Sequence, residues 1–272
     1  MLNKLDNIKP FLRWAGGKNW LIKHLVNFLP KQGFNDYHEP FLGGGSIYLS
    51  IKPINRAYLS DLNKELIEVY QSLKSDPENV IKVLESFKKT SDFYYKIRER
   101  EFQDPIKRAA RFIFLNQTSY NGIYRVNLQG KYNVPYAQRS KNFLEADNLR
   151  MVSISLQNAI LNYGDFEISK ENIKKGDLVF LDPPYTVSHN KNGFIKYNQK
   201  LFSLDDQKRL SLLIDYIKSK DAYYVLTNAA HETIEEIFSK GDYLIKLNRA
   251  NLIGGTNAKR GQTSEYVFTN VN

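Results

Sequence analysis

The segment that most constrains the fold is an apolar run, Leu178 to Leu181, followed directly by Asp182-Pro183-Pro184-Tyr185. Four apolar residues bounded by polar ones are typical of a strand that is buried on both faces. The prolines lack backbone N–H groups and hold the chain extended, but their carbonyls can still accept hydrogen bonds. Asp182 then lies at the carboxyl end of the strand, where open α/β sheets bind ligands. This turn offers a carboxylate, a carbonyl and an aromatic ring, which suit an amino group on a planar ring. A plain strand-ending turn with a surface Tyr185 is the alternative.

The hydrophobic pattern alternates between strands and helices on both sides of a helical middle block. Strands are predicted at residues 37–39, 56–59, 160–163, 178–181, 223–227, 243–247 and 266–269, and helices at 20–29, 63–73, 77–88, 92–102, 106–116, 144–158, 204–218 and 231–238. This alternation predicts an α/β fold with a parallel sheet. The block 64–155 also carries a β-hairpin signal around residues 124–134. We therefore expect a discontinuous sheet domain, residues 1–63 and 156–272, with residues 64–155 as an inserted domain.

Glycines follow the first predicted strand, and an aspartate ends the second. Gly43-Gly44-Gly45 lets the backbone approach a ligand closely. The third glycine of the dinucleotide fingerprint would fall at Tyr48, which disfavours an oxidoreductase. Asp61 could hold a ribose diol or simply cap the next helix.

Two further segments are candidates for ligand binding. Trp14-Ala15-Gly16-Gly17-Lys18 resembles a phosphate-binding loop, but Asn19 replaces the required Ser or Thr, so a nucleotide triphosphatase is disfavoured. Lys18 beside glycines still suits a carboxylate. Asp165 and Phe166 follow the strand 160–163 at the same expected edge, although core packing explains Phe166 equally well.

Composition excludes several classes of protein. The chain has no Cys and only four scattered His, so we expect no disulfide, no thiol nucleophile and no metal site. No segment is apolar enough to span a bilayer, and no secretory signal precedes the first motif. We expect a cytoplasmic protein without a membrane partner.

The net charge of +10 is concentrated in three stretches that contain no Asp or Glu, residues 105–144, 186–204 and 243–264. The first stretch also contains seven Phe and Tyr residues. Basic residues neutralise phosphates, and aromatic rings stack on unpaired bases, so this pattern favours a nucleic-acid partner. Solvated surface loops are the alternative.

Together the motifs resemble the Dam-type DNA adenine-N6 methyltransferases, over essentially the whole chain. The matching motifs are Arg-Trp-Ala-Gly-Gly-Lys at 13–18, Glu-Pro-Phe-x-Gly-Gly-Gly-Ser at 39–46, Ser-Asp-x-Asn at 60–63, Gly-Asp-Phe at 164–166, Asp-Pro-Pro-Tyr at 182–185 and Arg-Gly-x-x-x-Glu at 260–265. Their order also matches that of the family. The resemblance implies a Rossmann-like sheet, dependent on S-adenosylmethionine (AdoMet), with an inserted, mostly helical target-recognition domain carrying a β-hairpin.

The resemblance also implies a cofactor, a product and residue roles. AdoMet would donate the methyl group and leave as S-adenosylhomocysteine, with no metal. The implied cofactor-binding residues are Trp14, Lys18, Phe41, Gly43, Gly44, Gly45, Asp61, Asp165, Phe166 and Asp182. The implied catalytic residues are Asp182, Pro183, Pro184 and Tyr185. They would hold an adenine flipped out of the duplex, with its N6 lone pair aimed at the methyl group.

The hairpin region is similar to the family's DNA-reading segment. The implied DNA-binding residues are Tyr120, Asn121, Arg125, Asn127, Pro135, Arg139, Lys141, Phe194 and Tyr197. Arg125 would contact a guanine, Tyr120 and Asn121 would wedge into the gap left by the flipped base, and Arg139 and Lys141 would bind phosphate. Residues 190–197 would form a mobile loop over the base. We expect a GATC target in double-stranded DNA, three acid-free stretches lining one cleft, and action as a monomer or weak dimer.

Beside the oxidoreductase that the missing third glycine disfavours, two alternatives remain at this point. The same chemistry could act at another DNA site, on RNA or on a protein amide, although protein-glutamine methylases usually carry Asn at the position of Asp182. The chain could instead be a non-catalytic, AdoMet-responsive DNA-binding module. The intact Lys18, Asp61, Asp182 and Tyr185 argue against that reading.

Overall fold

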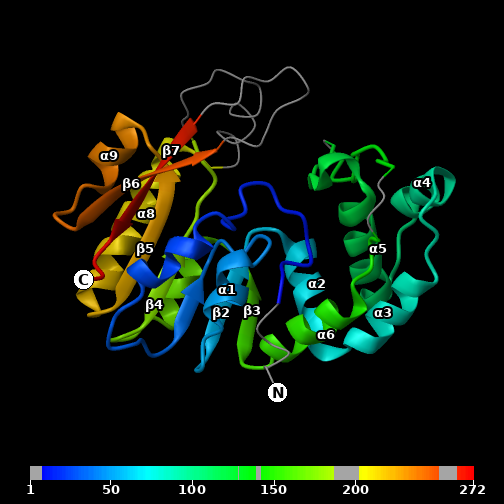
Figure 1. The fold of residues 1–272 in the computed structure, drawn as a ribbon, viewed down its shortest axis with the longest axis horizontal. Helices are drawn as coiled ribbons and strands as arrows, with labels where there is room; N and C mark the ends of the chain where they lie inside the picture. Colours follow the sequence, from blue (N-terminus) through cyan, green and yellow to red (C-terminus); the bar gives the residue numbers. More distant parts are fainter. Residues whose placement is uncertain (1–7, 128, 139–141, 187–201, 251–261) are drawn as a thin grey trace. The chain divides into compact units, whose positions relative to one another are not determined.

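A computed structural model describes residues 8–127, 129–138, 142–186, 202–250 and 262–272 (Figure 1). The strands form a seven-stranded sheet in the order β3-β2-β1-β4-β5-β7-β6. They are β1 (Tyr37–Glu39), β2 (Ala57–Asp61), β3 (Ala159–Tyr163), β4 (Leu178–Leu181), β5 (Tyr223–Ala229), β6 (Tyr243–Ala250) and β7 (Gln262–Thr269). Each predicted strand is present; β1 and β4 have the predicted ends, and the ends of the other strands are shifted by up to four residues. The α/β class is therefore confirmed.

The sheet is mixed, so the prediction of a parallel sheet is only partly correct. Strand β4 runs parallel to both β1 and β5, with Leu178 opposite Tyr37 and Tyr223. Strand β7 runs antiparallel to β5 on one side and to β6 on the other. The physical reason is the short connection from β6 to β7. Parallel neighbours need a crossover of a dozen or more residues, usually with a helix.

Most helices begin at a side chain that caps the free backbone N–H groups. Asn63, Asp76, Thr90 and Asp104 each accept from a backbone N–H in the first turn of the helix that follows. The α-helices are α1 (Ser46–Ile51), α2 (Lys64–Ser75), α3 (Pro77–Glu85), α4 (Ser91–Glu99), α5 (Pro105–Thr118), α6 (Ala146–Ser155), α8 (Leu204–Ser219) and α9 (Glu232–Phe238). The described residues also contain three 3₁₀ helices, η2 (Ile22–Phe28), η3 (Tyr120–Gly122) and η4 (Phe166–Glu171). The predicted helix at 20–29 is thus a 3₁₀ segment.

The chain divides into two compact units. The first combines the N-terminal segment up to Asn19 with Leu42–Ile54 and Leu59–Gly164, and the second combines Trp20–Phe41, Asn55–Tyr58 and Asp165–Asn272. This division differs from the predicted domain limits, which stay a prediction.

Each unit has an apolar core of its own. In the second unit, α8 packs against strands β4 and β5. That core includes Val179, Leu181, Tyr224, Leu226, Leu210, Leu213, Ile214 and Ile217. In the first unit, α2 and α5 pack against one another and against the shorter α3. Burying one such Leu or Ile stabilises the fold by roughly 1.5–3 kcal/mol.

The predicted β-hairpin forms a closed loop, but the described residues do not include a regular strand there. Val126 and Tyr132 form an isolated antiparallel bridge, and a second bridge joins Ser119 to Tyr136. The Asn133 N–H donates to the carbonyl of Arg125 at 3.1 Å. The two arms of this loop are therefore joined by backbone pairing at two positions, Ser119–Tyr136 and Val126–Tyr132.

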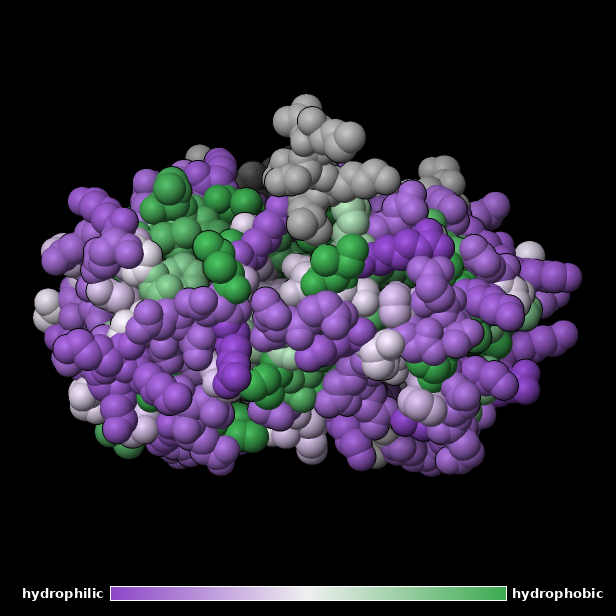
Figure 2. Space-filling model, turned by 90° about the horizontal axis from the view of Figure 1, so that it is seen from below, coloured by the Kyte–Doolittle hydropathy of each residue, from purple (hydrophilic) through white to green (hydrophobic). Residues whose placement is uncertain are grey.

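Within the described part of the chain, no helix is long and apolar enough to cross a membrane. Figure 2 shows a mainly hydrophilic face with a few apolar patches.

Candidate active site

The Asp-Pro-Pro-Tyr turn begins where β4 ends, and neighbouring strands fix its two functional side chains. Leu181 lies opposite Leu226 of β5, so the next residue, Asp182, lies beside Thr227. The Thr227 hydroxyl donates to Oδ1 of Asp182 at 2.8 Å. This contact sets the direction of a half-buried carboxylate at the predicted edge of the sheet. Sequence reasoning missed Thr227, although a polar residue ending an apolar strand run is a visible signal.

A buried glutamate orients the tyrosine of the same turn. The Tyr185 hydroxyl donates to Oε2 of Glu265, which lies on β7 and is 1% exposed. Glu265 is the last residue of the Arg-Gly-x-x-x-Glu motif, and the sequence did not indicate this role. Beyond the turn, Thr186 donates to the carbonyl of Phe202 and accepts from Gln207 of α8. The turn is therefore tied to β5, β7 and α8.

The glycine loop is shaped by a tryptophan ring. Gly43 has φ +49°, and a Cβ added there would lie 2.8 Å from Cδ1 of Trp14. Gly45 has φ +65° and caps α1, where an added Cβ would lie 2.8 Å from the Tyr70 hydroxyl. Tyr70 also donates to the carbonyl of Gly43. Only glycine combines this backbone conformation with such close neighbours.

Asp61 fixes the same loop from the end of β2. Its Oδ2 accepts from the Gly43 N–H at 2.9 Å, and its Oδ1 accepts from the Asn63 N–H at 2.9 Å. Burial raises the pKa of this carboxyl group, and the backbone hydrogen bonds oppose that rise only in part. The structure thus brings Trp14, Gly43 and Asp61 together, as the motifs predict. We call Trp14, Gly43–Gly45 and Asp61 the glycine-loop group.

The segment before the glycine loop is anchored to α5. The side chain of Asn116 accepts from the Arg13 N–H at 2.7 Å and donates to the carbonyls of Arg13 and Gly122. Trp14 stacks on Tyr124, with ring centroids 5.7 Å apart. Lys18 is buried at 3% exposure, and its ammonium donates to the Gly16 carbonyl at 3.0 Å. Asn116 was not predicted, and it joins the Trp14 segment to the start of the hairpin.

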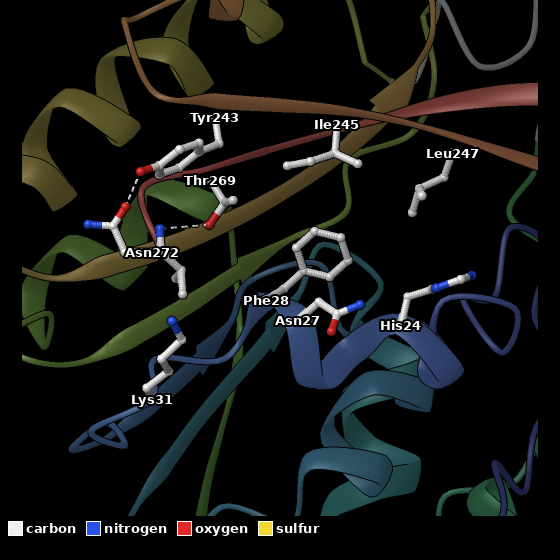
Figure 3. Close-up of a pocket in the computed structure, with 10 residues that line it drawn as sticks. His24, Asn27, Phe28, Lys31, Tyr243, Ile245, Leu247, Thr269 and Asn272 are labelled. Carbon is white, nitrogen blue, oxygen red and sulfur yellow. Dashed lines mark hydrogen bonds between the residues drawn. The ribbon is translucent and has the colours of Figure 1, made fainter.

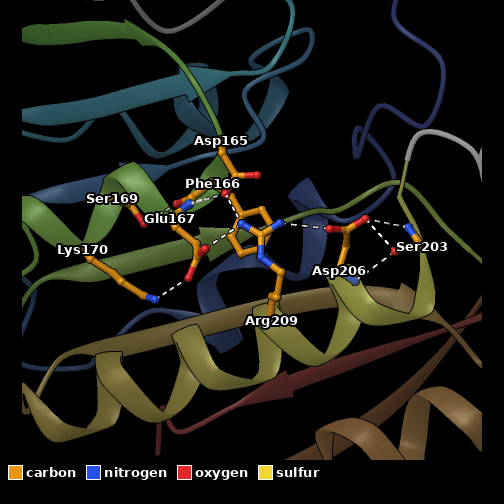
Figure 4. A network of polar contacts seen from close by, with 8 residues as sticks. All are labelled: Asp165, Phe166, Glu167, Ser169, Lys170, Ser203, Asp206 and Arg209. Carbon is orange, nitrogen blue, oxygen red and sulfur yellow. Dashed lines mark hydrogen bonds and ion pairs between the residues drawn. The ribbon is translucent and has the colours of Figure 1, made fainter.

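Asp165 and Phe166 begin η4 in the second unit. Phe166 is 4% exposed and joins the core, with its ring centroid 5.4 Å from that of the half-buried Phe41. In this structure Phe166 is therefore a residue of the core. Asp165 caps η4 and also pairs with Arg209 of α8 at 2.8 Å (Figure 4). Arg209 was not predicted.

The hairpin residues differ in how their side chains are used. Tyr120 is 55% exposed, and Asn121 adopts φ +55°. Arg125 donates from Nε to Oδ1 of Asn133 at 2.8 Å. Asn127 accepts from the backbone N–H groups of residues 129 and 131, so its side chain holds its own turn. The Pro135 carbonyl accepts from the Tyr120 N–H. Arg139, Lys141, Phe194 and Tyr197 lie outside the described residues, as do residues 187–201 of the second acid-free stretch and residues 251–261 of the third.

A hollow of about 600 Å³ lies in the second unit. His24 and Phe28 of η2 line one side of it, and Ile245 and Leu247 of β6 line the other (Figure 3). It contains none of the predicted site residues.

Comparison with known proteins identifies the class to which this sheet and its motifs belong. The chain belongs to the family of D12 class N6 adenine-specific DNA methyltransferases, whose model matches residues 14–252, and it is an adenine-specific DNA methyltransferase. Type II methyltransferase M1.LlaDCHI of Lactococcus lactis subsp. cremoris is 30% identical, over 98% of this chain and 97% of the relative. Type II methyltransferase M.MjaIII of Methanocaldococcus jannaschii is 36% identical, over 82% and 84%. The DNA adenine methylase of Escherichia coli K12 is 29% identical, over 92% of each chain.

Proposed function

We propose that this protein transfers the methyl group of AdoMet to N6 of an adenine flipped out of duplex DNA, within the sequence GATC. The observation that carries the proposal is the Asp-Pro-Pro-Tyr turn at the end of β4. Its carboxylate is set by Thr227 and its ring by Glu265. An acceptor and an aromatic face held from independent strands are what a planar ring with an amino group requires.

Membership of a methyltransferase family implies AdoMet, and two features of the chain fit such a ligand. The backbone at Gly43 has no room for a side chain and lies beside the carboxylate of Asp61. The half-buried ring of Phe41 lies beside Phe166. We assign the methionine part to Trp14, Lys18 and the glycines, and the ribose hydroxyls to Asp61. We assign Phe41, with the glycines, to the wall beside the methionine part, and the adenine ring to Asp165 and Phe166.

The chemistry rests on how the turn holds the target amine, while the cofactor supplies an electrophilic methyl group. Oδ2 of Asp182 and the carbonyl of Pro183 each accept one N6–H. These two hydrogen bonds localise the nitrogen lone pair out of the ring plane. Tyr185 stacks on the flipped base and holds it there. The nitrogen would attack the methyl carbon without a covalent enzyme intermediate, so that the S–CH3 bond breaks as the N–CH3 bond forms. S-adenosylhomocysteine would leave, and the proton lost from N6 would pass to the Asp182 carboxylate or to water.

We assign sequence readout to the hairpin. Asn133 holds the guanidinium of Arg125 through Nε and one terminal nitrogen. Arg125 is itself exposed, and a guanidinium held in this way suits a contact with the O6 and N7 atoms of guanine. Tyr120 and Asn121 are assigned to the gap left by the flipped adenine, and Asn127 and Pro135 to the walls of the hairpin. Arg139 and Lys141 are assigned to phosphate, and Phe194 and Tyr197 to the base.

The decisive experiment is transfer of tritiated methyl from AdoMet to duplexes with and without GATC. We expect the wild type to label only GATC duplexes and Asp182→Ala to lose at least about a thousandfold in rate, because both alignment and charge at N6 are lost. Asp205→Ala, which removes an aspartate that is 87% exposed, is the matched control and should keep full activity. Absence of labelling of any DNA by the wild type would refute the activity. Equal labelling without GATC would refute only the target.

A second experiment tests the assignment of the hairpin. Arg125→Ala should relax choice at one guanine and cost about 1–3 kcal/mol of discrimination, whereas Lys141→Ala should weaken all duplexes alike and reduce the salt slope by about one. If the two variants behave alike, the assignment of Arg125 is wrong. Sedimentation with and without duplex tests the further proposal that the protein acts as a monomer or weak dimer.

A further inference from the structure

Arg209 is the centre of a group of charged side chains around the start of η4 (Figure 4). Its guanidinium pairs with Asp165 at 2.8 Å and with Glu167 at 2.6 Å, and it pairs with Asp206 of its own helix at 2.9 Å. We call Arg209, Asp165, Glu167 and Asp206 the Arg209 network. Three carboxylates converge on one cation that is 39% exposed.

Two of these carboxylates have other contacts that fix them independently. Glu167 also pairs with Lys170, one turn along η4, at 2.5 Å. Asp206 forms the capping box of α8, in which it accepts from the backbone N–H and hydroxyl of Ser203. Glu167 and Asp206 therefore hold the two terminal nitrogens of the guanidinium without any contribution from Asp165.

In the remaining carboxylate, Asp165, one oxygen makes the contacts with the network. Its Oδ1 accepts from the Glu167 N–H at 3.0 Å and from Arg209. Among the described residues, the hydrogen bonds of Asp165 all involve Oδ1. Oδ2 is thus the oxygen available to a ligand donor.

Arg209 also contacts the aromatic ring of Phe166, the residue that follows Asp165. Its Cζ lies 4.8 Å from the centroid of the Phe166 ring, within cation–π distance. Phe166 in turn packs against Phe41 and Phe202. One side chain therefore holds both residues that we assign to the cofactor adenine.

The ion pairs of the Arg209 network add little to the stability of the fold, because pairs between side chains as exposed as these contribute about 0–1 kcal/mol each. Fixing the plane of a guanidinium from two sides is instead the way in which outer residues orient a ligand-binding group.

We propose that Arg209 is a positioning residue for the adenine end of AdoMet, which directs Oδ2 of Asp165 toward the 6-amino group and keeps the Phe166 ring in place. This inference rests on the proposed function. It predicts recognition of the amino group itself, because a carboxylate attracts an N–H donor and repels a 6-oxo group.

The test is calorimetric binding of S-adenosylhomocysteine and of its deaminated form, S-inosylhomocysteine, to the wild type and three variants. We expect the wild type to bind the adenosyl compound at least about tenfold more tightly, as expected for one hydrogen bond to a charged group. Arg209→Ala should bind it about tenfold more weakly and lose most of this preference. Arg209→Lys keeps the charge but lacks the planar set of N–H donors, so it should lose part of the preference for the adenosyl compound. The matched control, Lys208→Ala, removes a neighbouring ion pair on α8 and should change neither.

Steady-state kinetics separates positioning from a general loss of structure. Arg209→Ala should raise KM for AdoMet about tenfold and leave KM for DNA unchanged, with circular dichroism matching the wild type. If Arg209→Ala folds and still prefers S-adenosylhomocysteine as strongly as the wild type does, the inference is refuted and the proposed function is left intact. If the wild type binds neither compound, the proposed cofactor site fails and the inference fails with it. If neither Arg209 variant folds, the role is structural and the inference is wrong.

Discussion

The glycine-loop group and the Arg209 network are both assigned to the cofactor, yet they are built on different physics. The first is held by close contact. Trp14 lies against Gly43, and Asp61 accepts from two backbone N–H groups. The second is held by charge, through side chains that are between 30% and 45% exposed.

The difference shows what each arrangement can tolerate. Steric contact and buried hydrogen bonds depend little on salt but fail when a single methyl group is added. Exposed ion pairs tolerate substitution, since each contributes little, but they weaken as ionic strength rises. The three predictions below test whether the two regions really differ in this way.

The largest effect is expected from Gly43→Ala. Alanine at φ +49° costs about 1–2 kcal/mol, and forcing Cβ against Trp14 adds about 1–3 kcal/mol. Gly16→Ala is the matched control, because Gly16 has φ +81° and nothing within 4 Å of an added Cβ. It should lose only the conformational part, about 1–2 kcal/mol. Urea unfolding measures both values. Equal losses would mean that the Trp14 ring moves aside and that close contact does not hold this loop.

The same two regions also show how far a sequence leads. The glycine-loop group was predictable because Gly43, Asp61 and Trp14 fall in short motifs next to predicted strands. Strand β4 was predicted with its observed ends, because an apolar run between polar residues leaves little choice. Strand β7 was predicted too short, because the polar residues 262–265 hide its start. Its antiparallel direction was missed for the same reason, since the connection from β6 looked longer than it is.

The Arg209 network could not be predicted. Its contacts join η4 to α8 across more than forty residues of sequence, and exposed Asp, Glu and Arg carry no periodic signal. Thr227 and Glu265 were missed for a related reason. Their roles depend on strand register, which fixes Thr227 beside Asp182 and Glu265 beside Ala229. Hydrophobic periodicity does not determine that register.

An intermediate effect is expected from pH, and it has opposite signs in the two regions. Burial raises the pKa of Asp61, so its contribution to stability is full below its ordinary value of 3.8 and is lost as pH rises through the higher folded value. Hydrogen bonds from Lys170 and Arg209 lower the pKa of Glu167. For Asp206, burial opposes the shift, but hydrogen bonds from Ser203 and Arg209 outweigh it and lower the pKa. Their contributions are present at neutral pH and are lost as pH falls through the folded values.

Urea unfolding between pH 3 and 8 compares Asp61→Asn with Glu167→Gln. In Asp61→Asn, the loss of stability above pH 4 that this residue causes should disappear. In Glu167→Gln, part of the loss below pH 4 should disappear instead. Carbon-13 titration of the carboxyl groups provides a direct check, because Asp61 should take up its proton at a higher pH than Asp206. The reverse order would show that Asp61 is not desolvated and would remove the contrast between the regions.

The smallest effect is expected from salt. Arg209→Met keeps the apolar stem and removes the charge, so at low salt it should cost only about 0.2–1 kcal/mol of stability. At 1 M NaCl the Debye length falls to about 3 Å, which screens pairs of this exposure, and the cost should nearly vanish. The cost of Gly43→Ala should stay the same at both ionic strengths, because a steric overlap is not screened. A large, salt-independent loss in Arg209→Met would place Arg209 among the packed residues of the core. The two regions would then be built alike, and the loss of adenine recognition expected for Arg209 variants would have to be ascribed to packing.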